Sequence, residues 1–554
     1  MRTFLLTMIG ALCLAIFATT PPSPAGSNAP VTAFSAERAM VDVRRIASQP
    51  HPTGSAENAA VRGYISQRMQ SLGMEVATSE GQIGPRALAR LNKWSGKNDP
   101  AMALVNLIGV LPGRDRALPA LVLMSHHDTV WGSPGAPDDT AGVAASLEVA
   151  RAIRAKGQPE RDLVLLITDA EELGLEGAEH FFTQHPLRSR IGAVINMEAR
   201  GGGGRTTLFQ TSHNNGEAAR LYAAAVSRPG ASSLAAFVYS VLPNDSDLTP
   251  VIKGPYVAYN FAFIGRSGLY HSPLATPDRL DQGSLQDMGG QVLDLTGALL
   301  SSAQFPAKAP NAVFFDLFGL FTAFWPTWLG WPMLAAAIGA LGFAVRRDGR
   351  SGLVDGAVRM LGLLAVSGLG LYAFNRLSIG SGHGEYYDRL AAIPRLEVIA
   401  ASVCAAVFLL MFGNSKGGAA RDAGAALPLV LLGIALQALA PTAAYVVVVP
   451  VLLFALALAW PQVWLRVMSA GLIAGYMISL GHQLMQGVGP TMPMAAALPF
   501  ALGAMVLLPL WPALAAAKAR AAILGFLACA VAMALWVQFD APAETRAVYA
   551  DSKS

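Results

Sequence analysis

A chain of 554 residues with 53% hydrophobic and only 14% charged residues is too long and too apolar for one ordinary soluble domain. Its formal net charge of +4 is small, and no basic stripe with interleaved aromatic residues occurs, so the sequence gives no reason to expect nucleic-acid binding. The three cysteines, Cys13, Cys404 and Cys529, lie in apolar runs, which excludes a disulfide framework and a thiolate zinc site.

The N-terminal segment begins with Met and Arg2, continues with an apolar run from Phe4 to about Ala18, and is followed by the Pro- and Ser-rich sequence PPSPAGSNAP. This pattern is typical of a secretory signal peptide or a signal anchor. No clean cleavage site with small residues stands out, so the pattern slightly favours an uncleaved anchor over a signal peptide. We assign residues 1–30 to this segment and its linker, with a buried core helix as the less favoured alternative.

Residues 31–306 have the composition and periodicity of a soluble α/β domain. Four short apolar runs are typical of buried strands: LVLM (121–124), LVLLIT (163–168), AVINM (193–197) and YVAYNFAFI (256–264). The stretch 140–156 places apolar residues on one face, as expected of a helix that covers a sheet. Alternation of strands and helices predicts a mostly parallel central sheet flanked by helices.

Polar residues follow the ends of these predicted strands, where ligand sites of open α/β sheets lie. SHHDT offers His126 as a neutral imidazole ligand, with Asp128 able to hold its other ring nitrogen. In GAPDDTAG, Asp139 or Thr140 suits a helix cap, which leaves Asp138 free to reach a metal. Each motif alone also has an ordinary explanation as a turn or a cap.

The following strand ends carry more carboxylates. DAEELGLEG places Glu171 and Glu172 side by side, a costly pair unless a cation or a proton neutralises it. A helix N-terminus explains one glutamate more easily than two, whereas one metal ligand and one general base explain both. INMEARGGGG adds Glu198, and GRSGLYHSP adds His271. Two histidines with several carboxylates and no cysteine suit zinc or a related divalent metal, and a bridging carboxylate would make a two-metal site.

From about Pro326 onward the sequence becomes typical of a membrane protein. Eight apolar runs are each long enough to cross a bilayer: 327–345, 354–374, 396–413, 424–440, 442–460, 465–482, 492–511 and 520–537. Residues 307–540 are therefore predicted to form an all-α multispan membrane domain of about eight helices, followed by a polar tail at 541–554. The stretch 424–460 could instead be one re-entrant hairpin, which leaves the number of spans open by about two.

The positive residues favour one orientation of this membrane domain. If the N-terminus is cytoplasmic, residues 31–306 are exported and the chain then returns to the cytoplasm. Basic residues would fall on the cytoplasmic side in four loops: Arg346 with Arg347 and Arg350, Lys416 with Arg421, Arg466, and Lys518 with Arg520. Arg389 and Arg395 would fall outside and partly offset the pattern. We therefore expect a multi-pass protein of a bacterial inner membrane, with the domain at 31–306 on the periplasmic face.

The ordered series SHHDT, GAPDDTAG, AEELGL, NMEARG, NDSDLT and YHSP resembles metallopeptidase family 28 over about residues 40–300. The layout of a soluble domain followed by many spans is most similar to the multispan members, such as the endoplasmic reticulum metallopeptidase and the vacuolar membrane protease. The resemblance implies two zinc ions per chain and assigns a role to each motif residue. His126 and Glu198 would bind one zinc, Glu172 and His271 the other, Asp138 would bridge both, Glu171 would be the general base and Asp128 the partner of His126.

The same resemblance implies a cis peptide bond between Asp138 and Asp139. Two positions depart from the family pattern. Secreted members have Asp at the position of Glu198, whereas the membrane members have Glu there, as this chain does. Many members also have Asp at the position that Ala275 takes in this chain. Asp278 could compensate for that loss of support behind the last histidine.

The implied activity is that of a membrane-anchored zinc exopeptidase, with an aminopeptidase acting on peptides at the exported face as the leading hypothesis. Carboxypeptidase or dipeptidase activity stays open, and glutaminyl cyclase or an inactive receptor-like homologue is less favoured. A transport function would be marked by intramembrane charges, for which only His482 and Gln483 are candidates. The expected partners are a peptide substrate and the lipid bilayer; the oligomeric state stays open.

Overall fold

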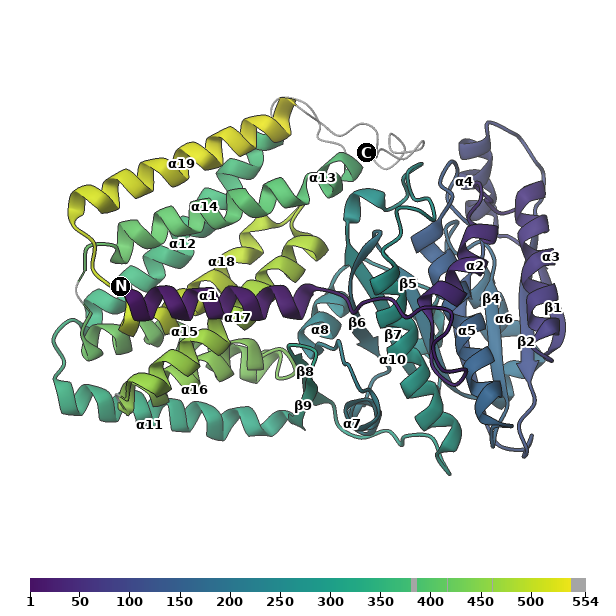
Figure 1. Cartoon of the computed structure of the whole chain (residues 1–554), viewed down its shortest axis with the longest axis horizontal. Helices are drawn as coiled ribbons and strands as arrows, with labels where there is room; N and C mark the ends of the chain where they lie inside the picture. Colours follow the sequence, from purple (N-terminus) through teal and green to yellow (C-terminus); the bar gives the residue numbers. More distant parts are fainter. Residues whose placement is uncertain (380–385, 416, 461, 540–554) are drawn as a thin grey trace. The chain divides into compact units, whose positions relative to one another are not determined.

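The computed structural model describes residues 1–379, 386–415, 417–460 and 462–539 (Figure 1). The chain forms two compact units. One is Thr20–Phe324, and the other combines Met1–Thr19 with the described residues from Trp325 onward. We describe each unit by itself.

The unit Thr20–Phe324 is built on a seven-stranded sheet with the order β1-β2-β4-β3-β5-β7-β6. The strands are β1 (Glu75–Gln82), β2 (Ala103–Leu111), β3 (Ala120–His126), β4 (Leu163–Thr168), β5 (Ile191–Ala199), β6 (Gly203–Thr211) and β7 (Val257–Gly265). The four central strands β4, β3, β5 and β7 run parallel, while β1 and β2 at one edge and β6 at the other are antiparallel. The predicted α/β class with a mostly parallel sheet is confirmed.

Both faces of the central strands are covered, which explains why these strands carry apolar residues on both faces. Along β3, Leu121 and Leu123 belong to the core on one face, and Val122 and Met124 to the core on the other. The first core is completed by α2 (Ala36–Ile46), α5 (Ala141–Lys156) and α10 (Gln282–Ser301), and the second by α6 (Glu176–Gln184) and α9 (Leu248–Ile252). The remaining elements of this unit are α3 (Ala56–Ser71), α4 (Pro85–Ser95), α7 (Gly216–Ala225), α8 (Ser233–Val241) and the short strand β8 (Ala312–Leu317). β8 pairs with the strand β9 (Phe321–Pro326).

The second unit is a bundle of apolar helices. They are α1 (Arg2–Thr19), α11 (Gly330–Asp348), α12 (Leu353–Ile379), α13 (Tyr386–Ala391), α14 (Ile393–Phe412), α15 (Ala419–Leu439), α16 (Tyr445–Ala459), α17 (Val463–Val488), α18 (Ala497–Leu507) and α19 (Ala516–Phe539). Within the described ranges, eight helical stretches are long and apolar enough to cross a membrane, one of them α1. The predicted all-α multispan region is therefore confirmed.

Helix α16 differs from the expected full-length span. It has 15 residues, and at a rise of 1.5 Å per residue it is about 22 Å long, shorter than a hydrocarbon core of about 30 Å. Its carboxyl end nevertheless lies beside that of α11, because Arg347 Nη1 donates to the Ala459 carbonyl oxygen at 2.7 Å. α15 and α16 are thus two separate helices, and α16 runs toward the end of the bundle that carries Arg347.

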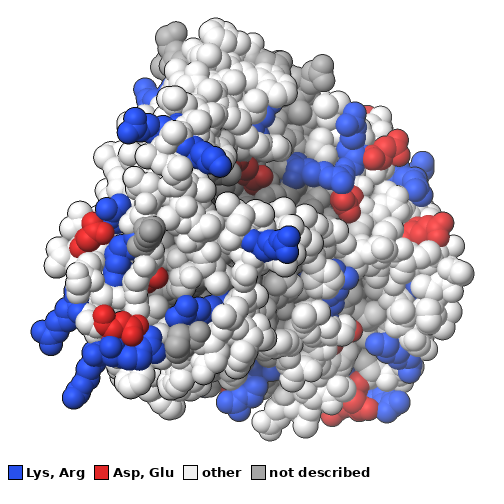
Figure 2. Space-filling model, turned by 60° about the vertical axis from the view of Figure 1, so that its left-hand side comes forward, with Lys and Arg blue, Asp and Glu red and all other residues white. Residues whose placement is uncertain are grey.

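Charged side chains form no continuous basic band on the face drawn in Figure 2. Blue and red side chains lie there in small separate groups, with wide uncharged areas between them.

Helix α1 is packed into the bundle through its small residues. Thr7, Ala11, Ala15 and Ala18 are its buried residues, and α1 lies alongside α17 (Figure 1). A Cβ atom added to Gly475 of α17 would lie 3.0 Å from the Ala11 carbonyl oxygen. Close approach of two helices through small residues is the usual way that membrane helices associate.

We therefore expect Gly475→Leu to destabilise the helical bundle by roughly 1–3 kcal/mol, the range for overpacking a close contact. Thermal unfolding of the purified full chain in detergent measures the effect. Gly525→Leu on α19 is the matched control, because a Cβ atom there meets nothing within 4 Å. Equal unfolding temperatures for the two variants would contradict the packing of α1 described above.

Candidate metal centre

Asp138 lies at the centre of a buried cluster of acidic and histidine side chains. Its Oδ1 is 3.2 Å from His126 Nε2, and its Oδ2 is 3.3 Å from His271 Nε2. The same nitrogen of His271 is 3.1 Å from Glu172 Oε2. Ligand atoms of His126, Asp138 and Glu172 all lie within 4.8 Å of one another. Four residues from four separate sequence motifs are thus brought together at one point.

The turn that carries Asp138 is fixed by its neighbour. The peptide bond between Asp138 and Asp139 is cis, as the family resemblance implies. Asp139 Oδ1 accepts a hydrogen bond from the Gly142 backbone N–H at 3.1 Å, and Oδ2 accepts one from the His126 N–H at 3.3 Å. Asp139 therefore caps the start of α5, as the sequence suggests, and joins this turn to the end of β3.

His126 is the last residue of β3, and its ring orientation is set by a backbone carbonyl. The distance from its Nδ1 to the Asp128 carbonyl oxygen is 2.9 Å. The Asp128 carboxylate oxygen Oδ1 lies farther from that nitrogen, at 3.5 Å. With Nδ1 donating to the carbonyl, Nε2 is the ring nitrogen left to face Asp138 and a metal.

The Asp128 carboxylate also supports the loop that carries the two glutamates. Its two oxygens accept hydrogen bonds from the backbone N–H groups of Glu171, at 3.0 Å, and Glu172, at 3.2 Å. The preceding residue, Ala170, has a φ of +58°, a strained value for a residue with a Cβ atom. Asp128 therefore fixes the loop that presents both glutamates, in addition to supporting His126 through its carbonyl.

The adjacent glutamates point to different parts of the cluster. Glu172 Oε2 faces His271, whereas its Oε1 is buried without a hydrogen-bond partner among the described residues. Glu171 Oε2 is 4.0 Å from His126 Nε2, and its side chain is the more exposed of the two. This arrangement suits a metal ligand at Glu172 and a residue that can meet a substrate at Glu171.

Glu198 lies near the end of β5, one residue before its last position. Its Oε1 accepts a hydrogen bond from Asn196 Nδ2 at 3.2 Å. Burial raises the pKa of Glu198 to about 8; the charge of His126 lowers this pKa, and the charge of Asp138 raises it. The metal-ligand group formed by His126, Asp138 and Glu172 does not include Glu198, so its role as a ligand stays a prediction.

The loop that carries His271 is supported without an aspartate at position 275. His271 itself has a φ of +56°, and the Tyr270 ring stacks on its imidazole with centroids 3.7 Å apart. The Ala275 carbonyl oxygen accepts a hydrogen bond from the Ala136 N–H at 2.9 Å, which ties this loop to the Asp138 turn. Asp278 is exposed, so the compensation expected from it is replaced by backbone bonding.

The electrostatics of the cluster favour a bound cation. Burial raises the pKa of Glu171 well above its usual value, and the charges of Glu198 and Glu172 raise it further. Burial would also raise the pKa of Asp138, but hydrogen bonds from His126 and His271 outweigh burial and lower it to about 2. Buried carboxylates that cannot all ionise together become compatible when a divalent cation supplies positive charge. The donor set of imidazole nitrogens and carboxylate oxygens, with the unpartnered Oε1 of Glu172, fits zinc.

One buried acid of the cluster had no role assigned from the sequence. Asp247, from the NDSDLT motif, accepts a hydrogen bond from Thr168 Oγ1 at the end of β4. Burial raises the pKa of Asp247 to about 6, and its charge in turn raises the pKa of Glu198 and Glu171. The motif NDSDLT is part of the family resemblance, but its position in the sequence does not show that Asp247 interacts with the acidic and histidine residues of the cluster.

Zinc binding is expected to release protons, because two candidate ligands hold protons in the metal-free protein. Burial lowers the pKa of His126, but hydrogen bonds to Asp128 and Asp138 outweigh burial and raise it well above the usual value. Burial raises the pKa of Glu198 to about 8. Zinc must displace protons from these groups before they can act as ligands, so binding at pH 7 should release protons. Affinity should therefore rise with pH until these groups are deprotonated.

Calorimetry of zinc binding at pH 7, in buffers that differ in ionisation enthalpy, measures this release. The same titration at pH 9, above the pKa of Glu198, should show fewer protons released. A binding enthalpy independent of the buffer at pH 7 would contradict the expected protonation of His126 and Glu198.

Comparison with known proteins identifies a family that matches part of the chain. Residues 106–296 match the model of Peptidase family M28, which confirms the resemblance inferred from the motifs. Endoplasmic reticulum metallopeptidase 1 of Rattus norvegicus is 32% identical over 311 residues, covering 54% of this chain and 35% of the relative. The vacuolar membrane protease of Eremothecium gossypii is 31% identical over 299 residues, covering 52% and 29% respectively. The similarity spans about a third of the length of these relatives.

Among solved structures, an aminopeptidase from Aneurinibacillus sp. strain AM-1 is similar to this chain at 17% identity and a TM-score of 0.40. The match covers 51% of this chain and 98% of that one. A glutaminyl cyclase from Porphyromonas gingivalis matches at 21% identity and a TM-score of 0.37, covering 47% and 97%.

Proposed function

We propose that this chain is a membrane-anchored dizinc metallopeptidase, and that it acts as an aminopeptidase on peptides at the exported face of the membrane. The observation that carries the proposal is the convergence of His126, Asp138, Glu172 and His271 on one buried point, with Glu171 beside them. The match of residues 106–296 to Peptidase family M28 supports the same reaction class.

Five residues would hold two zinc ions. His126 and Glu198 would bind one ion, Glu172 and His271 the other, and Asp138, whose two oxygens face the two histidines, would bind both. When bound, zinc would lower the pKa of a coordinated water toward neutral and polarise the carbonyl of the scissile peptide bond.

Glu171 is the residue we propose as the general base. It is not needed as a ligand, since its oxygen lies 4.0 Å from His126 Nε2 while Glu172 makes the close contact to His271. Its carboxylate would take a proton from the attacking water and pass it to the amine that leaves. The N–H bonds to Asp128 hold the backbone of Glu171 in place for both transfers.

One part of the proposal, the restriction of cleavage to N-terminal residues, rests on the family resemblance alone. Relatives of this domain are described as metallopeptidases and a membrane protease, and carboxypeptidase or dipeptidase action would use the same metal site. A glutaminyl cyclase would use fewer ligands than the five proposed here, and an inactive homologue would not need to retain Glu171 in place.

Purified full-length protein, with its metal content measured, should be tested on peptides with free and with blocked N-termini. Release of the first residue from free N-termini alone supports an aminopeptidase. Cleavage of blocked peptides from the carboxyl end would replace that assignment by carboxypeptidase, and formation of pyroglutamate without hydrolysis would replace it by cyclase. The Glu171→Gln protein is the control for contaminating peptidases.

A further inference from the structure

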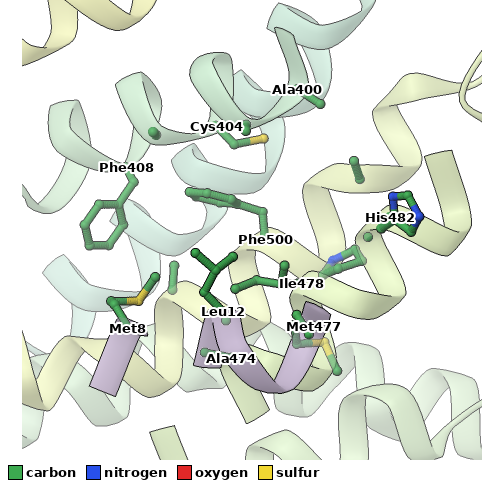
Figure 3. Close-up of a pocket in the computed structure, with 18 of the residues that line it drawn as sticks. Met8, Leu12, Ala400, Cys404, Phe408, Ala474, Met477, Ile478, His482 and Phe500 are labelled. Carbon is green, nitrogen blue, oxygen red and sulfur yellow. The ribbon is translucent and has the colours of Figure 1, made fainter. Parts of the chain in front are cut away.

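The helical bundle contains an apolar cavity of about 650 Å³. Its walls come from α1, α14, α17 and α18, with Met8 and Leu12 on one side and Cys404, Ile478 and Phe500 on the others (Figure 3). This volume lies within the roughly 300–1,000 Å³ typical of small-molecule sites. The cavity is therefore large enough to hold a ligand rather than being a packing defect.

The two ends of the cavity differ in chemistry. Aromatic rings line one end, where Trp511 meets Phe4 and Phe408 edge to face, with centroids 5.1 and 4.8 Å away. At the other end His482 Nδ1 lies 2.8 Å from Glu397 Oε1, and both side chains are partly exposed. The cavity is thus apolar along its length and polar at one end only, as a site for an amphiphile would be.

The length of the cavity matches a lipid chain rather than a protein helix. On α1 the lining runs from Phe4 to Thr19, and fifteen residue steps along a helix rise about 22 Å. That is shorter than a hydrocarbon core of roughly 30 Å. The cavity can therefore take up an acyl chain, whereas a transmembrane helix needs the full thickness and would not fit.

We propose that this cavity binds one acyl chain of an aminophospholipid, whose ammonium group is recognised by Glu397. The carboxylate of Glu397 accepts from His482 and, at 3.2 Å, from Gln486 Nε2, and it retains capacity for one more donor. A negative charge at the entrance favours a cationic donor and disfavours the carboxylate of a free fatty acid. The lipid would fill the space between α1 and α14.

Photo-crosslinking tests the proposal on the full chain in nanodiscs. The probe is phosphatidylethanolamine with a diazirine in one acyl chain, and labelled peptides are identified by mass spectrometry. We expect labels on the cavity-facing parts of α14, α17 and α18. Ala405→Phe, which fills the cavity, should reduce this labelling at least fivefold, while Ala336→Phe on the exposed face of α11 should not.

Labels spread over the outer faces of the bundle and unaffected by Ala405→Phe would overturn the proposal. Glu397→Gln is the milder second variant, since it keeps the shape of the side chain and removes its charge. It should lower labelling by phosphatidylethanolamine several-fold and leave labelling by a diazirine fatty acid unchanged. Stronger labelling of the original protein by the fatty acid than by phosphatidylethanolamine would overturn the assignment of the head group.

Discussion

Replacing Glu171 by Gln is expected to reduce kcat by roughly 10²–10⁴-fold, the usual contribution of a general base, with zinc content unchanged. The amide cannot take a proton from water at neutral pH, but it keeps the size of the side chain. Glu171 also makes no close contact with the proposed ligand atoms beyond the 4.0 Å approach to His126. Peptide hydrolysis and metal analysis on the same preparation measure the two effects separately.

The neighbouring residue supplies the matched comparison. Glu172→Gln should lose zinc as well as activity, because Glu172 Oε2 faces His271 at 3.1 Å. Glu179→Gln, on the exposed side of α6, should change neither quantity. If Glu171→Gln loses as much zinc as Glu172→Gln, the roles of base and ligand are assigned to the wrong glutamates.

Asp138→Asn is expected to give the second large effect, a loss of both zinc ions and of activity by at least about a hundredfold. Substitutions behind metal ligands already cost 10–100-fold, and Asp138 contacts both histidines directly, at 3.2 and 3.3 Å. The amide removes the negative charge that attracts the cations, and its NH₂ group cannot act as a ligand oxygen.

Metal content by mass spectrometry and hydrolysis of a free N-terminal substrate test this prediction. Asp278→Asn is the control, since Asp278 lies exposed on the loop that carries His271. Retention of two zinc ions per chain in Asp138→Asn would show that Asp138 is not the bridging ligand. Circular dichroism of both variants shows whether the fold is kept.

The central strands could be predicted because burial on both faces demands unbroken apolar runs. LVLLIT became β4, and LVLM lies within β3. The edge strands gave no such signal. β1 has the sequence EVATSEGQ and β6 the sequence GGRTTLFQT, since an edge strand partly facing solvent tolerates polar residues and glycine. Long-range pairing, rather than local composition, defines those strands.

The candidate site could be predicted to the level of its motifs but not of its contacts. Strand-end positions showed that His126, Asp138, Glu171 and Glu172 would gather at one edge of the sheet. Sequence spacing does not show which oxygen of Asp128 meets His126. The Asp128 carbonyl oxygen lies nearest to His126 Nδ1, and the carboxylate, 3.5 Å from the same nitrogen, also accepts from the glutamate loop.

In the membrane region, too, the local sequence pattern predicted the helices but not the contacts between them. Hydropathy located the helices, and α16, with 15 helical residues, proved shorter than the eight described stretches that are long enough to span a membrane. His482 was noticed as a polar residue near the end of a predicted span. Its partner Glu397 lies 85 positions earlier in the sequence, at the start of another predicted span. Only the packing of α14 against α17 brings the two side chains together.

The packing of α1 against Gly475 of α17 bears on how the protein can be produced. Heterologous expression often exchanges a native N-terminal segment for a generic leader that signal peptidase removes. Here such an exchange would expose the small-residue face of α17 to lipid and remove one wall of the apolar cavity. Yield and detergent stability should therefore depend on the native sequence of residues 1–19, and affinity tags on this protein belong elsewhere.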